Sequence, residues 1–262
     1  MNTNSNLYTV IYTTVIVVVV AAVLAFVSQS LKSKQEANEK AETISQMLTA
    51  GGFGTKAEFQ AMGNAKVLET YGKEISEAFT VDASGARVAG LDIASREVFS
   101  PGQLKAQNYK VKGGEGYALP VFIFKNGITV VPVYGAGLWG PVWGYIAFES
   151  DCKTIHGAYF DHESETAGLG AKIKDDPAFQ AEFKGEQAWF GQSPVFAIVR
   201  GGAPAENGKS VIDNQIDAIT GATMTSNGLS AAINAWLSAY AGYFGAAAPC
   251  TGCSENEKTV EE

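Results

Sequence analysis

Histidine, cysteine and basic residues are all scarce in this chain. It has only two histidines and three cysteines in 262 residues, so a metal site rich in histidine is not expected and no metal ligand is assigned. Lysine and arginine number 19 against 27 acidic residues, which gives a formal net charge of -8. Proteins that bind nucleic acid present a basic face, so this charge balance argues against that class.

What the chain does have is a long apolar segment at its N-terminus. Residues 7–27 carry no charge. As a helix they would span about 31 Å, enough for the core of a bilayer. A cleaved signal peptide is the alternative, because Ala21, Ala22 and Ala25 resemble a cleavage site. Its apolar part would be shorter, however, and a basic residue would precede it. We therefore expect a transmembrane anchor over residues 1–31.

Beyond the anchor, the sequence predicts one folded domain. Residues 32–50 are mostly polar and predict a helical stalk, which Gly51, Gly52 and Gly54 would end. Residues 51–248 are long and apolar enough for a sizeable core, and residues 249–262 form a charged, flexible tail.

Local patterns inside the domain predict helices together with antiparallel strands. Residues 58–75 have helical spacing, and residues 78–90 read as strand and turn, with a hairpin tip at residues 82–85. Asn126 and Gly127 separate two β-rich runs, residues 121–124 and 128–131, which is a strong signal for a hairpin.

A run of hydroxyl-bearing and small residues, Asp217-Ala-Ile-Thr-Gly-Ala-Thr-Met-Thr-Ser226, is the most informative part of the chain. Apolar residues recur at helical spacing from Leu229 onward, so Thr225, Ser226 or Asn227 is the expected N-cap of a helix. A helix N-terminus attracts anions, and small residues leave room for one to approach, so we expect a bound phosphate here. The plainer alternative is an ordinary capping sequence before a surface helix.

Two glycine-rich segments precede that run. Residues 134–148 combine four glycines with large flat side chains, which would suit a flavin ring. Taken alone, the segment favours the plainer interpretation, a bulged strand whose tryptophans fill the core. Residues 161–171 contain Glu163 and Glu165. These two carboxylates could be a general acid and base, but a solvated loop is the more usual meaning of such a pair.

The three segments together resemble the NqrC subunits of the Na+-translocating NADH:quinone oxidoreductases. Asp-x-x-Thr-Gly-Ala-Thr matches the flavinylation motif of that family and of its Rnf relatives. Gly-x-Gly-Leu-Trp and Glu-Thr-Ala-Gly-Leu-Gly match two further segments, with Ala167 in place of the usual proline. The resemblance implies an α+β FMN-binding domain with twisted, largely antiparallel sheets and flanking helices.

The resemblance also implies a cofactor and a set of residues around it. A separate flavin transferase would esterify Thr223 with the phosphate of FMN, and this chain would have no catalytic residue of its own. The other expected flavin contacts lie in the three matching segments: Thr220, Gly221, Ala222, Thr225, Ser226, Glu165, Thr166, Leu169, Gly170, Gly137, Leu138 and Trp139.

Partners and location follow from the same resemblance. It implies a subunit that relays electrons from an iron-sulfur centre towards quinone, inside a multi-subunit complex in the bacterial inner membrane, with its domain in the periplasm. The basic residues Lys32, Lys34 and Lys40 follow the apolar segment and point to the opposite orientation. An Rnf-type subunit and a membrane-anchored module that binds a phosphorylated ligand reversibly remain as alternatives.

The cysteines receive no functional role from the sequence. Cys152 stands alone and is expected to be a small buried apolar residue. Cys250 and Cys253 form a Cys-x-x-Cys pair in the C-terminal tail, which could be a disulfide, a redox pair or a pair without a function.

Overall fold

The computed structural model describes residues 6–200 and 214–245, which divide into two compact units, Met1–Lys40 and Ala41–Glu262. Helix α1 (Asn6–Ala50) is continuous over 45 residues. In the first unit its apolar side chains are exposed, and its length and composition are sufficient to cross a membrane.

The last turns of α1 belong to the core of the second unit. Ile44, Met47 and Leu48 are fully buried there. The helix ends at Ala50, directly before the glycines, as predicted, and Gly52 has a φ of 74° that favours a residue without a side chain. Two helices follow, α2 (Lys56–Met62) and α3 (Asn64–Glu74), so the predicted single helical stretch is divided at Gly63.

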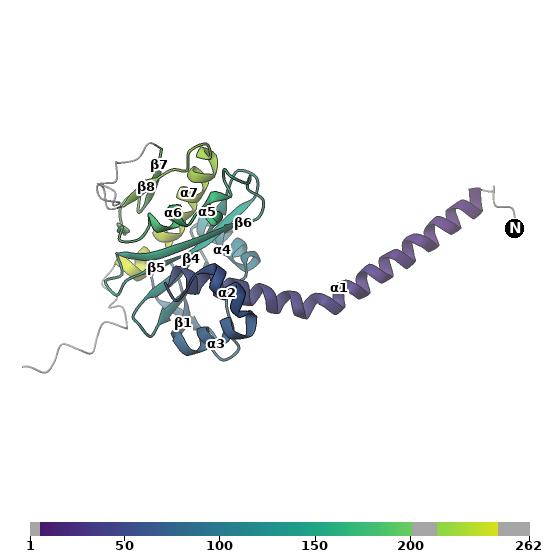
Figure 1. Cartoon of the computed structure of the whole chain (residues 1–262), viewed down its shortest axis with the longest axis horizontal. Helices are drawn as coiled ribbons and strands as arrows, with labels where there is room; N and C mark the ends of the chain where they lie inside the picture. The colour runs from purple at the N-terminus through teal and green to yellow at the C-terminus, as the bar shows by residue number, and fades with distance from the viewer. Residues whose placement is uncertain (1–5, 201–213, 246–262) are drawn as a thin grey trace, which may run out of the picture. The chain divides into compact units, whose positions relative to one another are not determined.

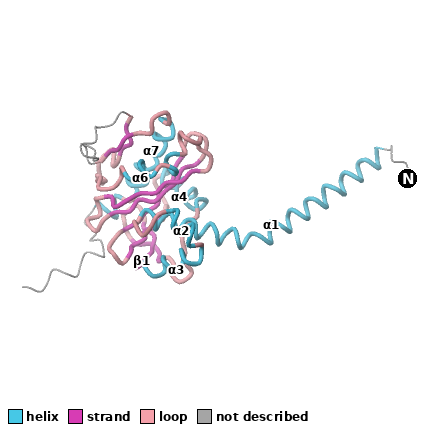
Figure 2. Tube along the Cα trace, viewed as in Figure 1, coloured by secondary structure: helices cyan, strands magenta, loops and turns pink. Residues whose placement is uncertain are grey.

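A six-stranded antiparallel sheet forms the centre of the second unit (Figure 2). Its spatial order is β2-β1-β3-β4-β5-β6. The predicted hairpin at Asn126 and Gly127 is confirmed, because β3 and β4 pair antiparallel across it and Gly127 has a φ of 85°. The strands are β1 (Ile75–Val81), β2 (Arg87–Gly90), β3 (Leu119–Phe124), β4 (Thr129–Ala136), β5 (Pro141–Phe148) and β6 (Ile155–His162).

Helices cover both faces of this sheet, because side chains of successive strand residues point to opposite faces and both sets are apolar. Val130 of β4 packs in the cluster that contains the end of α1, α2 and α3, whereas Val131 and Val133 pack in the cluster that contains α4 (Pro101–Gly113) and α7 (Thr223–Ala239). Figure 1 shows α7 and α2 on different sides of the central strands. The α+β class with a largely antiparallel sheet is therefore confirmed.

Smaller elements complete the second unit. Strands β7 and β8 are the exception to antiparallel pairing, since they form a separate parallel pair. The remaining elements are α5 (Lys172–Asp175), α6 (Pro177–Ala181), β7 (Ala197–Val199), β8 (Gln215–Asp217) and α8 (Ala241–Gly245).

Helix α7 lies unusually close to the end of β4. A Cβ atom on Gly228 would overlap the carbonyl oxygen of Ala136, and one on Gly135 would overlap the side chain of Ala232. The two glycines therefore let the helix backbone approach the strand backbone. Trp236 anchors the helix further along, fully buried and with its indole N–H donating to Asn108 Oδ1 at 3.1 Å. This packing brings the first turn of α7 beside the turn that connects β4 to β5.

Candidate flavin site

The three sequence segments meet at the carboxylate of Glu165. Its Oε1 accepts a hydrogen bond from the backbone N–H of Trp139 at 2.9 Å, and its Oε2 accepts one from the hydroxyl of Thr225 at 2.6 Å. Trp139 lies in the β4–β5 turn, Glu165 in the loop after β6, and Thr225 in the first turn of α7. One buried side chain, only 8% exposed, therefore joins all three.

Glycines make room for this carboxylate. A Cβ atom on Gly137 would overlap Glu165 Oε1, and one on Gly170 would overlap both Glu165 Oε2 and the Thr225 hydroxyl. Gly168 has a φ of 74°, a backbone conformation that glycine adopts without strain, and it turns the chain next to Glu165. The expectation of a solvated acidic loop holds for Glu163, which is exposed, and is wrong for Glu165.

The same contacts set the ionisation of Glu165. Burial acts to raise its pKa, but hydrogen bonds from the Thr225 hydroxyl and from the backbone N–H groups of Trp139, Leu138 and Gly140 act in the opposite direction and prevail. The pKa therefore lies below the ordinary value of a glutamic acid. The carboxylate is charged at neutral pH and accepts hydrogen bonds only.

This lowered pKa predicts a pH dependence of stability. A carboxyl whose pKa is depressed by folding stabilises the folded state at pH values above its unfolded pKa, about 4.3, and loses that contribution as the pH falls through the folded value. Urea unfolding of the wild type and of Glu165→Gln between pH 7 and pH 3 measures this. The stability difference between the two proteins should shrink below about pH 4, and a constant difference would contradict the assignment.

The first turn of α7 is open to an anion. The helix begins at Thr223, with Ala222 as an N-cap that offers no side-chain hydrogen bond, and its first turn has no acidic residue. The predicted N-cap at Thr225, Ser226 or Asn227 is therefore wrong. The reason is that the Thr225 hydroxyl donates to Glu165, and Ser226 Oγ accepts from the backbone N–H of Ile219 at 3.1 Å. Among the described residues, the N–H groups of Thr223 and Met224 have no acceptor.

The hydroxyl groups near this helix end differ in accessibility. Thr220 is exposed and Thr223 is half-buried, whereas Thr225 and Ser226 are 1% and 0% exposed and are hydrogen bonded inside the protein. Gly221, with a φ of 82°, turns the chain between Thr220 and Thr223. Thr223 is therefore the threonine that lies in the first turn of α7 and is also partly exposed to solvent.

Exposed apolar side chains surround the same place. They come from the β4–β5 turn, the loop after β6 and the first turn of α7: Leu138 is 48% exposed, Trp139 69%, Leu169 43% and Met224 62%. A Cβ atom on Gly221 would lie 3.1 Å from Leu169 Cδ2, so the loop after β6 touches the threonine segment. Large apolar side chains left in water mark a ligand or interaction surface.

The positions of Trp139 and Trp143 decide between the two interpretations of residues 134–148. The segment is a hairpin of β4 and β5 with a turn between them, so the expectation of one bulged strand is wrong. Trp139 stands exposed at the turn and fills no core, whereas Trp143 is half-buried and its indole N–H donates to Gln46 Oε1 at 3.3 Å. The turn thus presents a flat apolar side chain beside an open helix end.

An FMN group fits these residues. Its phosphate would meet the free N–H groups and the positive end of α7, and its apolar ring would meet Leu138, Trp139 and Leu169. The segments that hold the twelve expected contacts meet here. Three of these side chains, Glu165, Thr225 and Ser226, are buried and bonded to protein groups, so they support the site from inside.

Sequence reasoning missed two residues that support the site. His162 Nδ1 accepts from the backbone N–H of Glu165 at 3.1 Å, and Gly228 permits the close approach of α7 to β4. The small residues Gly228 and Ala232, four apart on one helix, were a signal for close packing that the sequence did contain.

Cys152 is buried in the main core cluster, as predicted, and is 7% exposed. It is also disulfide bonded, which the sequence reasoning did not anticipate. Cys250 and Cys253 lie outside the described residues.

This fold and site define a flavin-binding domain, and comparisons with known proteins agree. The model of the FMN-binding domain family matches residues 137–238. A solved structure of the NqrC subunit of the Na+-translocating NADH-quinone reductase from Parabacteroides distasonis is 32% identical, with a TM-score of 0.65, over 82% of this chain and 97% of that one. The chain belongs to this NqrC family.

Further relatives give the same result. The corresponding Na+-translocating NADH-quinone reductase subunit from Vibrio parahaemolyticus is 29% identical over 228 residues, which is 79% of this chain and 81% of the relative. The solved structure of NqrC from Shewanella oneidensis is 23% identical with a TM-score of 0.59, over 79% of this chain and 96% of that one, and supports the fold.

Proposed function

We propose that this subunit of the Na+-translocating NADH-quinone reductase carries FMN as a phosphoester on Thr223. The observation that carries the proposal is the uncapped N-terminus of α7, which has a solvent-accessible threonine as its first residue and an apolar rim beside it. Family membership supports the cofactor, and the site supports the position of the link.

Each part of the site has a separate task. Thr223 Oγ1 bonds to the phosphorus of the flavin donor. One oxygen substituent of that phosphorus leaves in exchange, and the proton of the threonine hydroxyl goes with it. The backbone N–H groups of α7 neutralise the remaining phosphate charge. Gly221 keeps the approach open, and Leu138, Trp139 and Leu169 hold the ring. FMN supplies the electron chemistry when bound.

The chain does not need its own catalytic residues for this role. A threonine hydroxyl has a very high pKa and reacts only when another group activates it. Among the described residues no group of three His, Cys, Asp or Glu could hold a metal ion, and Glu165 is committed to structural hydrogen bonds. We assign the attachment to a separate flavin transferase, as the family resemblance implies.

Dependence on the transferase tests this proposal against reversible binding. The full chain, produced with and without a flavin transferase, should retain flavin after denaturation only when the transferase is present. A module that binds a phosphorylated ligand reversibly would lose it with the fold in both cases. In-gel flavin fluorescence is the measurement, and no retained flavin in the transferase-supplied chain would contradict the proposal.

Electron transfer requires partners on the exposed side of the site. We place this chain between an iron-sulfur centre as donor and a second flavin as acceptor, both in other subunits of the complex. The four exposed apolar side chains support such contacts, because they leave the ring position open to a partner surface. The direction of transfer, towards quinone, is part of the same proposal.

We place the domain in the periplasm, and the disulfide of Cys152 supports this. Disulfides persist in oxidising compartments and are rare in the cytosol. The charge asymmetry of Lys32, Lys34 and Lys40 is small and does not determine where a large trailing domain lies. Protease added to intact spheroplasts should digest the domain, while a cytosolic marker survives. Protection until the membrane is opened would place the domain in the cytoplasm.

A further inference from the structure

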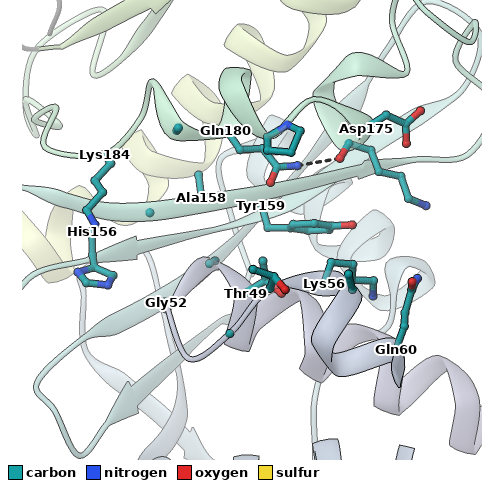
Figure 3. A pocket seen from close by; sticks show the side chains of 18 of the residues that line it. Thr49, Gly52, Lys56, Gln60, His156, Ala158, Tyr159, Asp175, Gln180 and Lys184 are labelled. Atoms are coloured by element: carbon teal, nitrogen blue, oxygen red, sulfur yellow. Dashed lines mark hydrogen bonds between the residues drawn. The ribbon is translucent and has the colours of Figure 1, made fainter. Parts of the chain in front are cut away.

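Two hollows that are not lined by any of the expected flavin contacts differ in how their lysines are used. The larger, of about 730 Å³, lies along β6 between the end of α1 and α6 (Figure 3). Two of its ammonium groups are already neutralised, because Lys56 pairs with Glu42 and Lys174 pairs with Asp161. The smaller, of about 200 Å³, lies between α4 and the residues that end β4 and begin β5. Its lysines are unpaired.

One face of α4 supplies these lysines. Lys105, Tyr109 and Lys112 line the smaller hollow at helical spacing, and all three side chains are exposed. Within the part of the chain that the structure describes, none of the three forms an ion pair or a hydrogen bond. The helix carries a third lysine, Lys110, and no acidic residue. It is therefore a basic surface on a chain whose net charge is -8.

A hydroxyl group without a hydrogen-bond partner belongs to the same hollow. Tyr134 of β4 lines it and is only 5% exposed, yet among the described residues its hydroxyl makes no hydrogen bond. The hydroxyls of Tyr71 and Tyr243 also lack partners, but the protein encloses them completely. Burial raises the pKa of Tyr134 and the charge of Glu163 raises it further, so the hydroxyl stays protonated at neutral pH and can donate.

Two ammonium groups and a phenol hydroxyl thus surround one small space. A carboxylate accepts hydrogen bonds from all three donors and is attracted by the two positive charges. The chain does not supply this carboxylate itself. Glu163 is near enough to act on Tyr134, but it is exposed and makes no side-chain hydrogen bond or ion pair among the described residues. An acidic group from outside the chain complements the hollow.

The hollow borders the turn that carries two of the expected flavin contacts. Ala136 and Pro141 line it, and these two residues pair with each other at the base of the β4–β5 turn. Leu138 and Trp139 stand exposed on that turn. Protein interfaces combine an apolar centre with a polar rim, so a partner that covers the turn would place its rim over α4.

We propose that the hollow receives an acidic side chain of the subunit that exchanges electrons with this flavin, and that α4 is the basic rim of that docking surface. Such charge pairs steer association and fix the orientation of the partners. An anionic lipid surface would use the lysines and leave the Tyr134 hydroxyl unused, so a protein carboxylate fits the hollow better. The inference rests on the electron transfer proposed above and specifies the chemistry of the partner's surface.

Zero-length crosslinking identifies the occupant. A carbodiimide joins an ammonium group to a carboxylate only where the two are in contact. In the purified complex in detergent, Lys105 or Lys112 should be joined to an aspartate or glutamate of another subunit. Lys110, exposed on the same helix but outside the hollow, should not be. A crosslink to Glu163 alone, or none from either lysine of the hollow, overturns the proposal.

Charge reversal measures the effect on electron transfer. Lys112→Glu and Lys110→Glu change the charge of one helix equally, but only the first alters the hollow. Stopped-flow absorbance follows the reduction of the covalent flavin by NADH in the purified complex at low salt. Reduction should be about ten-fold slower in Lys112→Glu and unchanged in Lys110→Glu. Equal rates in the two variants overturn the inference.

The flavin link is checked separately in each variant. In-gel fluorescence of the denatured protein should be as strong in Lys112→Glu and Lys110→Glu as in the wild type, because neither residue lies in the flavin site. A slow reduction with the flavin retained is then a docking defect, whereas flavin missing from the wild type as well would count against the link to Thr223.

Discussion

Replacing Thr223 by valine removes all flavin that survives denaturation of the chain. Valine keeps the shape of threonine but has no oxygen to bond to phosphorus. Thr223 is the half-buried first residue of α7, and the methyl groups of valine would fit where the threonine lies, so the fold should remain intact. In-gel fluorescence of the denatured protein, produced with a flavin transferase, measures the loss.

Two further variants decide whether the hydroxyl is the right one. Thr223→Ser keeps an oxygen and should retain covalent flavin, though less of it. Thr225→Val removes a buried hydroxyl that donates a hydrogen bond to Glu165. This variant should therefore be less stable but should keep the covalent flavin. Flavin retained in Thr223→Val and lost in Thr225→Val would mean that the ester is on the second threonine.

Replacing Glu165 by alanine should lower the free energy of unfolding by about 2–4 kcal/mol. The change removes the charge-assisted hydrogen bonds from the Thr225 hydroxyl and the Trp139 N–H, and it leaves the Thr225 hydroxyl buried without its acceptor. It also leaves a void between Gly137 and Gly170. The β4–β5 turn, the loop after β6 and α7 lose their common partner, so flavin attachment should fall as well. Urea unfolding at pH 7 gives the stability.

The matched control lies two residues earlier in the same loop. Glu163 is exposed, and Glu163→Ala should change stability by no more than about 0.5 kcal/mol. A stability loss at Glu165 no greater than at Glu163 would contradict the role of Glu165 as the residue that joins the three segments.

Local signals in the sequence accounted for much of the fold. Asn126 and Gly127 specified a hairpin because Gly127 supplies the positive φ that a tight turn needs. Residues 7–27 indicated, by length and composition, a helix that could cross a membrane. The division of the helical stretch at Gly63 was also a local feature, though the helical spacing on both sides concealed it.

The start of α7 and the role of Glu165 depend on contacts between residues distant in the sequence, so local patterns did not predict them. The start of α7 was misplaced because Thr225 and Ser226 look like capping residues, and only the fold shows that distant groups use their hydroxyls. Glu165 was read as a flavin contact or as a solvated residue for the same reason. Its partners lie 26 and 60 residues away in the chain, beyond the reach of any local pattern.

The most direct test of a covalent flavin on Thr223 is the mass of the proteolytic peptide that contains this residue. The peptide is taken from the full chain matured with a flavin transferase and then denatured. We predict that it carries the added mass of FMN less one water, and that fragmentation places this mass on Thr223. An unmodified peptide, with FMN recovered free in solution, would contradict the account.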